Sequence, residues 1–476
     1  MEDHATPTPA RRFIPVLLVV LLFYAASLPV VFSSHIVNGR AAADHLNYHE
    51  PVIHNFAREW PTPDLSNYHS ATTPLYHLLF AGIEVFFEPS RRGFMLLAGV
   101  FTAALLALLV GAMRGTTVQR LSLALPVLGS MYVLFPGIWL LPDNVAWLGV
   151  LGILLLALRA GTMRALLLVG GPVLLLLVLT RQIHLWAAGV LWAAAWLGTD
   201  RACEPDVGAP LRPLARMSDL VTGLGPRLKR LAPAVLATLP AFAAIGYFVN
   251  LWGGFIVPRY QTGYHGGYEG WNPATAAFFL SIVGSFAPFY LAHARTGLRR
   301  LWRSPRVLIG VVALALVLTL IPETTYAAEE GRKSGLWNLV KAAPVIAGHT
   351  SIVLAGLAPI GAVLVAGLLA QMRPREAWIY LGAMVGFVVA QTASPQLWQR
   401  YHEPFILILL ALMSTEVAAD GPSRPGRWTG VWQVAGPALL GLGLAGVSFW
   451  TIATDKPAVG LPTGDFERSK EYEPLR

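Results

Sequence analysis

The sequence predicts an all-α integral membrane protein of about 12 to 14 transmembrane helices, and three observations support this fold class. Of its 476 residues, 55% are hydrophobic and only 13% are charged, whereas a soluble protein carries about 25% charged residues. Long stretches, such as 100–112 and 165–180, contain no charged residue. These stretches are rich in Leu and Ala and lack the alternation of a β-strand, so they satisfy their backbone groups in lipid as helices.

A hydrocarbon core about 30 Å thick requires about 20 apolar residues for each helical span. The apolar stretches lie near 13–33, 72–88, 93–113, 121–140, 144–158, 165–180, 183–198, 231–251, 274–293, 307–321, 346–371, 377–394, 403–418 and 430–452. We interpret the first as an uncleaved helix rather than a signal peptide, because it is long and ends in a weak cleavage site. No repeat or soluble segment of domain size interrupts the series, so we expect one membrane domain over 1–476.

The loops between these stretches are of two kinds. The basic kind, which includes 199–230, is rich in Arg, and the positive-inside rule places it in the cytoplasm. The other kind is rich in aromatic, His, Asn and acidic residues and faces the opposite side; it comprises 34–71, 252–273, 322–345 and 395–402. The net charge of +9 is therefore assigned to cytoplasmic loops and anionic lipid rather than to nucleic acid. The single cysteine, Cys203, excludes an internal disulfide.

The N-terminal third does not fit a strict alternation of spans. With 34–71 outside, counting spans places Arg91 and Arg92 inside, but it places Asp143 inside as well. One span between 72 and 140 must therefore be half-length, re-entrant or doubled, and the sequence leaves these alternatives open.

The first external loop, 34–71, carries the densest set of chemically capable side chains. Six of the twelve histidines lie between positions 35 and 77. A helical pattern that includes Val52, Ile53 and Phe56 predicts a short helix with one apolar side on the membrane surface. A functional site is the favoured interpretation, and an interfacial loop anchored by Trp and Tyr is the alternative.

Asp44 is the residue in this loop that we single out. A carboxylate at the edge of the bilayer suits a general base that takes a proton from a hydroxyl group, and an Asp that caps the following short helix is an equal alternative. The histidines also raise the question of a divalent metal, with Asp44, His45, His49 and His54 as candidate ligands. His45 and His49 have i, i+4 spacing, but no H-E-x-x-H motif is present, so a metal stays an open alternative.

Three further polar segments open predicted spans on the same side. Asp143 is either a helix N-cap or a second site carboxylate. Arg181 starts a helix against the macrodipole, which predicts either a phosphate or carboxylate partner or snorkelling to lipid headgroups. Arg400 could hold a phosphate through two parallel hydrogen bonds. In 252–272, Arg259 and His265 stand among glycines and aromatic residues, a composition that suits sugar stacking and interface anchoring equally.

In their order along the chain, these motifs resemble GT-C superfamily glycosyltransferases, most closely the dolichyl-phosphate-glucose alpha-1,2-glucosyltransferase family. The resemblance is carried by Asp44 with His49, by Thr72-Thr73-Pro74-Leu75-Tyr76, by Arg181-Gln182-Ile183-His184-Leu185-Trp186, by Trp252-Gly253-Gly254-Phe255-Ile256-Val257, and by Arg400-Tyr401-His402-Glu403-Pro404. The sequence departs from the family after the fourth motif, where Pro258-Arg259-Tyr260 replaces Gly-Asp-Lys.

The resemblance implies a GT-C-like fold with a helical first external loop and an inverting transfer from a polyprenyl-phosphate sugar to a glycan or lipid-linked acceptor. It implies Asp44 as base, with Asp143 assisting or positioning the acceptor, and no firm cofactor beyond the divalent metal left open above. The implied substrate-binding residues are His49, Tyr68, Thr73, His77, Arg181, Gln182, Trp186, Arg259, His265, Arg400, Tyr401 and Glu403. A bacterial relative would work at the extracytoplasmic face of the inner membrane.

Two rival functions remain open at this point. A transporter or flippase of a lipid-linked saccharide would place ionisable residues near the bilayer midplane. Here they lie mainly at span ends, with Glu84 and His293 as exceptions. A polysaccharide ligase or polymerase is the second rival.

Overall fold

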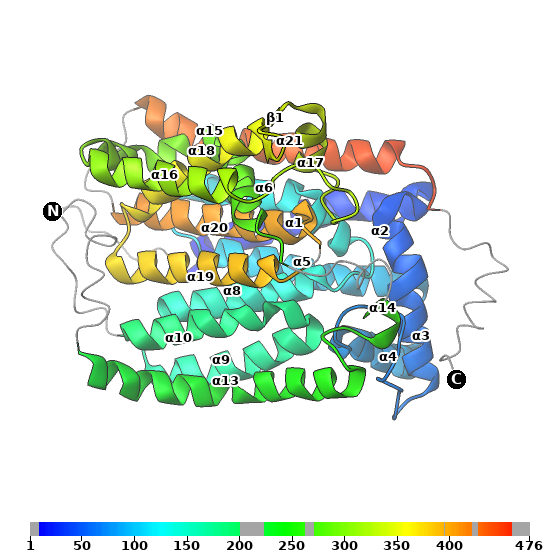
Figure 1. The fold of residues 1–476 in the computed structure, drawn as a ribbon. Helices are drawn as coiled ribbons and strands as arrows, with labels where there is room; N and C mark the ends of the chain where they lie inside the picture. The colour runs from blue at the N-terminus through cyan, green and yellow to red at the C-terminus, as the bar shows by residue number, and fades with distance from the viewer. Residues whose placement is uncertain (1–8, 200–222, 262–270, 395, 421–426, 459–476) are drawn as a thin grey trace.

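The computed structural model describes residues 9–199, 223–261, 271–394, 396–420 and 427–458. Most of the cytoplasmic loop predicted at 199–230 lies outside the described residues, as do Cys203 and His265. In the described parts the chain is all-α except for one small hairpin, and its long helices run side by side in one bundle (Figure 1).

The chain begins with α1 (Pro9–Val31) and continues through the polar segment 34–58 as short turns of helix. These are a 3₁₀ turn at Ser34–Val37, α2 (Gly39–Asp44), a π-helical turn at His45–His49, and α3 (Glu50–Arg58). The predicted helical character of the first external loop is thus confirmed for this stretch.

The remaining helices follow in chain order. They are α4 (Leu75–Phe87), α5 (Arg91–Ala112), α6 (Thr117–Gly129), α7 (Met131–Leu134), α8 (Asp143–Arg159), α9 (Met163–Thr180), α10 (Ala187–Leu197), α13 (Leu224–Trp252), α14 (Pro258–Gln261), α15 (Thr275–Trp302), α16 (Pro305–Leu320), α17 (Leu336–Ala342), α18 (Ile352–Leu369), α19 (Pro374–Thr392), α20 (Gln399–Asp420) and α21 (Arg427–Thr454). The span predicted from 346 begins six residues later, because β1 (Val345–Ile346) and β2 (Thr350–Ser351) pair as an antiparallel hairpin before α18.

Seven described helices are long and apolar enough to cross a membrane. They are Phe13–Val31, Arg91–Ala112, Met163–Thr180, Leu224–Trp252, Thr275–Trp302, Ile352–Leu369 and Trp428–Thr454. An eighth span results if Thr117–Gly129 and Met131–Gly137, bent by 78°, are counted together. Each of the fourteen predicted stretches contains a helix, but the count by length and composition is lower than the expected one. Several of the others, such as Leu75–Phe87 and Pro305–Leu320, are apolar but too short.

Helix α4 resolves the topology of the N-terminal third. Its 13 residues extend over only about 20 Å, less than the apolar core of a bilayer. At its start, the backbone N–H of Thr73 bonds the Gln182 side chain, and towards its end Glu84 bonds His54 of α3. Both ends therefore lie against the same polar layer, and α5 begins there with Arg91, which pairs with Glu50. The strict count that separated Arg91 from the first polar segment is wrong, because α4 does not cross.

The bundle has two chemically different ends. We call the end that carries α2, α3, α4 and α14 the site end, and the opposite end, where α8, α10 and α15 finish, the arginine end (Figure 1). At the arginine end, Arg375 donates hydrogen bonds to the carbonyl oxygens of Ala157, Leu158 and Gly198. Guanidinium groups there satisfy carbonyls at helix C-termini that have no partner within their helix.

Helices α15 and α18 pack closely because glycines face each other along their contact. A Cβ atom added at Gly361 would lie 1.9 Å from the carbonyl oxygen of Leu280, and one added at Gly284 would lie 2.1 Å from that of Leu357. Small residues of this kind allow the backbones of membrane helices to touch, where packing rather than the hydrophobic effect drives association.

We predict that Gly361→Ala lowers the midpoint of thermal unfolding in detergent, by strain of about 1–3 kcal/mol. Gly356→Ala, on the same helix with nothing within 4 Å of the added Cβ, is the matched control. It should leave the midpoint unchanged or raise it, because Ala favours helix over Gly by about 1 kcal/mol. Equal effects of the two substitutions would contradict the proposed role of the glycine contact.

Candidate functional site

Two carboxylates and two guanidinium groups meet at the site end. Arg400 Nη1 lies 2.6 Å from Asp44 Oδ2, and Arg400 Nη2 lies 3.0 Å from Asp143 Oδ2. Arg181 Nη1 lies 2.5 Å from the other oxygen of Asp143. We call these four residues the ion cluster. Sequence reasoning predicted all four as site residues, and the structure brings them together.

The four residues come from segments far apart in the sequence. Asp44 ends α2, Asp143 is the first residue of α8, Arg181 follows α9 with extended backbone, and Arg400 lies in the first turn of α20. The capping alternatives for both aspartates are wrong: Pro142 occupies the N-cap of α8, and Asp44 makes no side-chain cap hydrogen bond. The anionic partner predicted for Arg181 is a carboxylate, that of Asp143.

Exposure increases across the ion cluster from one side to the other. The side chain of Asp143 is 1% exposed and that of Arg181 is 13% exposed, whereas Arg400 and Asp44 are 21% and 23% exposed. A buried carboxylate is tolerated only when it is paired and hydrogen-bonded, and the two arginines meet that need for Asp143. Asp44 has one cationic partner and stands at the solvent side, so it is the carboxylate that a ligand meets first.

The residues around Arg400 along α20 have different roles. The ring of Tyr401 lies beneath the Arg181 guanidinium at 5.2 Å, a cation–π contact that holds the arginine in place. Glu403 is 2% exposed and accepts hydrogen bonds from Ser130 and Gln399. The structure therefore places Glu403 in the packing of α20, with both of its oxygens engaged, and its role in substrate binding stays a prediction.

A side-chain clamp joins three of the predicted motifs. Gln182 accepts from the backbone N–H of Thr73 at 3.1 Å and donates to the carbonyl oxygens of Ala71 and Phe255 at 2.9 and 3.1 Å. Thr73 also donates through its hydroxyl to the Val178 carbonyl at 2.6 Å. Gln182 and Thr73 thus position the ion cluster by tying the first polar segment to the end of α9.

Several predicted binding residues belong to the packed interior. Trp186 packs against Phe387 and Phe405. His49 stacks on His77 with Nδ1 and Nε2 2.9 Å apart. Burial, followed by the neighbouring His77 and the charge of Arg400, holds the pKa of His49 well below its usual range, so its ring is neutral.

Tyr68 is buried against Phe56 and donates its hydroxyl to the Thr72 carbonyl. These side chains therefore belong to the packing that supports the ion cluster.

The apolar side of α3 also faces inward. Val52, Ile53 and Phe56 are buried with Tyr76 and Phe80 of α4. The expectation that this side lies on the membrane surface is wrong, because α4 covers it.

A second charge network, which sequence reasoning missed, lies beside the first. Glu50 is 3% exposed and pairs with Arg91 at 2.8 Å and with His45 at 3.4 Å. His54 lies 2.7 Å from Glu84 and 3.8 Å from Glu50. Burial raises the pKa of Glu50. The neighbouring His45, His54 and Arg91 together lower it by more, so the net pKa lies below its usual range and the group is ionised. The one available signal was Glu84, a carboxylate inside an apolar stretch.

The four candidate metal ligands of the first segment do not converge. Asp44 is engaged by Arg400, His49 by His77, and His54 by Glu84, while His45 accepts from the Leu140 backbone N–H at 3.3 Å. Within the described ranges, no group of three or more His, Cys, Asp or Glu side chains is placed to hold a metal ion. The structure therefore does not bring these four residues together as a metal site.

A group of aromatic rings lies near Asp44 of the ion cluster. Tyr48, in the turn after Asp44, stacks on His69 at 5.1 Å, and His69 contacts Tyr260 at 5.8 Å. Burial, followed by the charge of Arg259, lowers the pKa of His69 to about 4. Arg259 itself donates its backbone N–H to Asn67. This platform of Tyr48, His69 and Tyr260 brings the 252–261 segment onto the first polar segment, and Tyr48 and Tyr260 were not among the predicted site residues.

In comparisons with known proteins, the chain matches no family model, no curated protein and no solved structure. Its function is therefore inferred from its residues and their geometry.

We predict that Asp143→Asn destabilises the protein by about 3–5 kcal/mol, because it leaves two largely buried guanidinium groups facing one another without their shared counter-charge. Denaturant unfolding in detergent measures the change. Asp64→Asn is the control, since Asp64 is exposed and uses Oδ1 to accept from the Ser66 backbone N–H, an acceptor that Asn retains. Equal stability of both variants would show that Asp143 is not needed to balance the arginines.

We also predict a pH-dependent contribution from His54. The nearby carboxylate of Glu50 raises the pKa of His54, burial opposes this, and the hydrogen-bonded Glu84 raises it further. A raised pKa in the folded state stabilises the protein below pH about 6.5, and this stabilisation is lost as the pH rises through the folded-state pKa. The stability difference between wild type and His54→Gln should therefore be largest at pH 5.5–6 and shrink towards pH 8.5. A difference that does not change with pH would argue against a protonated His54.

Proposed function

We propose that this protein is an integral membrane glycosyltransferase of the GT-C type, which transfers a sugar with inversion from a polyprenyl-phosphate donor to a lipid-linked or other extracytoplasmic acceptor. The observation that carries the proposal is the ion cluster: a solvent-side carboxylate, Asp44, bonded to Arg400, which shares the buried Asp143 with Arg181.

The charges of the ion cluster suit a phosphate-linked donor. Two guanidinium groups and two carboxylates sum to zero, so the resting site needs no counter-ion. A donor phosphate can take the place of Asp44 on Arg400, because a guanidinium binds phosphate and carboxylate with the same planar pair of donors. Asp143, held by Arg181 as well, keeps Arg400 oriented during this exchange.

The exchange would free Asp44 for the chemistry. The acceptor hydroxyl oxygen attacks the anomeric carbon, the bond from that carbon to the phosphate oxygen breaks, and polyprenyl phosphate leaves with the bonding electrons. The hydroxyl proton passes to Asp44 and then to water. General-base assistance of this kind contributes about 10²–10⁴ to the rate.

The position of the ion cluster matches the physical form of such a donor. The cluster lies at one end of the bundle, where α8 begins and α9 ends, so a lipid tail can stay among the helices while the sugar phosphate reaches the polar layer. The platform of Tyr48, His69 and Tyr260 offers aromatic faces on which a sugar ring can stack. Within the described residues, the arginine-rich connections 295–306 and 373–375 lie at the other end, which the positive-inside rule assigns to the cytoplasm.

Asp44→Asn in purified protein should reduce sugar transfer from polyprenyl-phosphate sugars by about 10²–10⁴-fold, with the product followed by mass spectrometry. Asp64→Asn, a charge change in the same polar segment at an exposed position, should retain full activity. If the Asp44→Asn variant retains sugar transfer, Asp44 is not the general base. Movement of a lipid-linked saccharide across vesicles without any transfer by the wild type would replace this proposal with a flippase function.

Arg400→Lys tests the phosphate-binding role separately. Lysine keeps the positive charge but loses the planar pair of donors, so we expect the KM for the donor to rise by at least about tenfold while binding of a neutral acceptor is unchanged. A variant that affects only the acceptor KM would place the donor phosphate elsewhere.

A further inference from the structure

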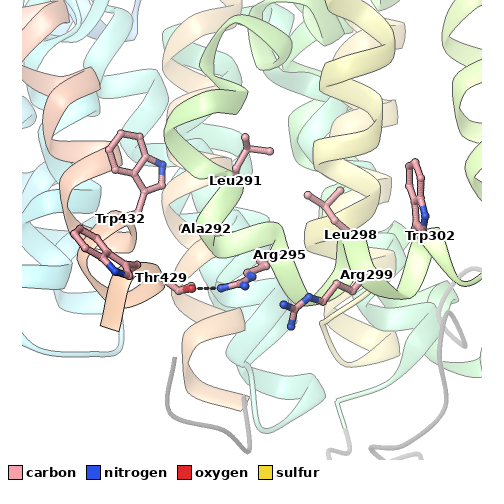
Figure 2. A pocket seen from close by; sticks show the side chains of 9 residues that line it. Leu291, Ala292, Arg295, Leu298, Arg299, Trp302, Thr429 and Trp432 are labelled. Atoms are coloured by element: carbon pink, nitrogen blue, oxygen red, sulfur yellow. Dashed lines mark hydrogen bonds between the residues drawn. The ribbon is translucent and has the colours of Figure 1, made fainter. Parts of the chain in front are cut away.

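A groove of about 650 Å³ opens between α15 and α21 at the arginine end, far from the ion cluster. It is lined by Leu291, Ala292, Arg295, Leu298, Arg299, Trp302, Trp428, Thr429 and Trp432. None of these nine residues carries a negative charge. Figure 2 shows Arg295 and Arg299, one helical turn apart on α15, with their side chains on the same face and their guanidinium groups below Leu291 and Leu298.

The two helices touch above the groove. A Cβ at Gly436 of α21 would lie 2.3 Å from the Phe289 carbonyl oxygen of α15, so only glycine permits this close approach. Beside it, His293 Nε2 lies 2.9 Å from the Gln433 carbonyl oxygen. The groove is therefore the space below a tight helix contact, bounded by backbone that cannot easily shift.

Among the described residues, the two arginines of the groove have no acidic partner. Arg295 donates to the Thr429 hydroxyl (Figure 2). Over the ranges that the structure describes, Arg299 forms neither an ion pair nor a side-chain hydrogen bond. This contrasts with Arg181 and Arg400 at the site end, each of which binds a carboxylate.

The chemistry of the groove changes along its length. Trp302 and Trp428 are 78% and 84% exposed, as expected for tryptophans near a membrane–water boundary. In Figure 2 the guanidinium groups of Arg295 and Arg299 lie lowest, and the side chains of Leu298, Trp302 and Leu291 lie above them, towards the middle of the bundle. An amphiphile with a negative headgroup and apolar chains shows the same order of groups.

We propose that this groove binds one anionic phospholipid, with its phosphate between Arg295 and Arg299 and its acyl chains along Leu291 and Trp432. The proposal does not depend on the function assigned to the ion cluster. Each arginine near a membrane surface strengthens the binding of an anionic lipid about fivefold, so the pair predicts a preference for anionic over zwitterionic lipid of roughly 25-fold.

The test uses purified full-length protein in neutral detergent, titrated with phosphatidylglycerol or phosphatidylcholine that carries brominated acyl chains. Quenching of tryptophan fluorescence reports binding. We expect phosphatidylglycerol to quench at a concentration roughly 25-fold lower than phosphatidylcholine, and Trp428→Phe with Trp432→Phe to remove most of this high-affinity quenching. Equal affinity for the two lipids in the wild type would overturn the proposal without any variant.

Two double variants then locate the site. Arg295→Gln with Arg299→Gln should abolish the preference for phosphatidylglycerol, whereas Arg303→Gln with Arg306→Gln should keep it. The control pair removes the same charge at the same end, where α15 finishes and α16 starts, and does not line the groove. Equal losses in both double variants would show a general surface potential and overturn the proposal. Full competition by the water-soluble headgroup, glycerophosphoglycerol, would likewise overturn it in favour of a simple anion site.

Discussion

The buried carboxylate of Asp143 is the group on which the site end of this protein depends. Its side chain is 1% exposed, and such a charge persists only when cations approach it closely. The positive charge comes from Arg181 and Arg400, which lie in opposite halves of the chain. They are separated from Asp143 by 38 and 257 positions. Arg400 also donates a hydrogen bond to Asp44. The contacts of Arg400 and Arg181 with the two aspartates therefore join the first polar segment to α8, α9 and α20. A structural requirement for charge balance thereby assembles the groups that the proposed chemistry uses.

The first polar segment is a folded layer rather than a flexible connection. The inward side of α3 packs on α4, the His49–His77 pair lies beneath it, and the Gln182 clamp fastens it to α9. Rigid support of this kind matters for a site with few charges, because the direction of each guanidinium decides which anion it binds. The same layer explains why α4 stays at the site end: both of its ends are held by polar contacts there.

Arginine serves different purposes at the two ends of the bundle. At the arginine end, Arg375 donates hydrogen bonds to carbonyl oxygens at the C-termini of α8 and α10. At the site end, guanidinium groups pair with carboxylates and prepare a place where a phosphate can compete. The groove of Arg295 and Arg299 belongs to neither class, because among the described residues Arg295 bonds only a threonine hydroxyl and neither arginine pairs with a carboxylate. The proposed lipid would supply the missing negative charge, just as the proposed donor would compete for Arg400.

By itself, the sequence determined the all-α membrane fold, the location of nearly every helix and the four members of the ion cluster. Apolar runs and charged residues at their ends are local properties, and lipid leaves the backbone few alternatives to helix. Only the tertiary structure decided that α4 does not cross, that His49, His77, Tyr68, Trp186 and Glu403 are packed rather than exposed, and that Glu50 joins a second charge network. These outcomes depend on which side chains meet across the bundle. A histidine-rich segment has the same composition whether it faces a ligand or stacks against α4, and the difference arises from contacts between residues remote in the chain.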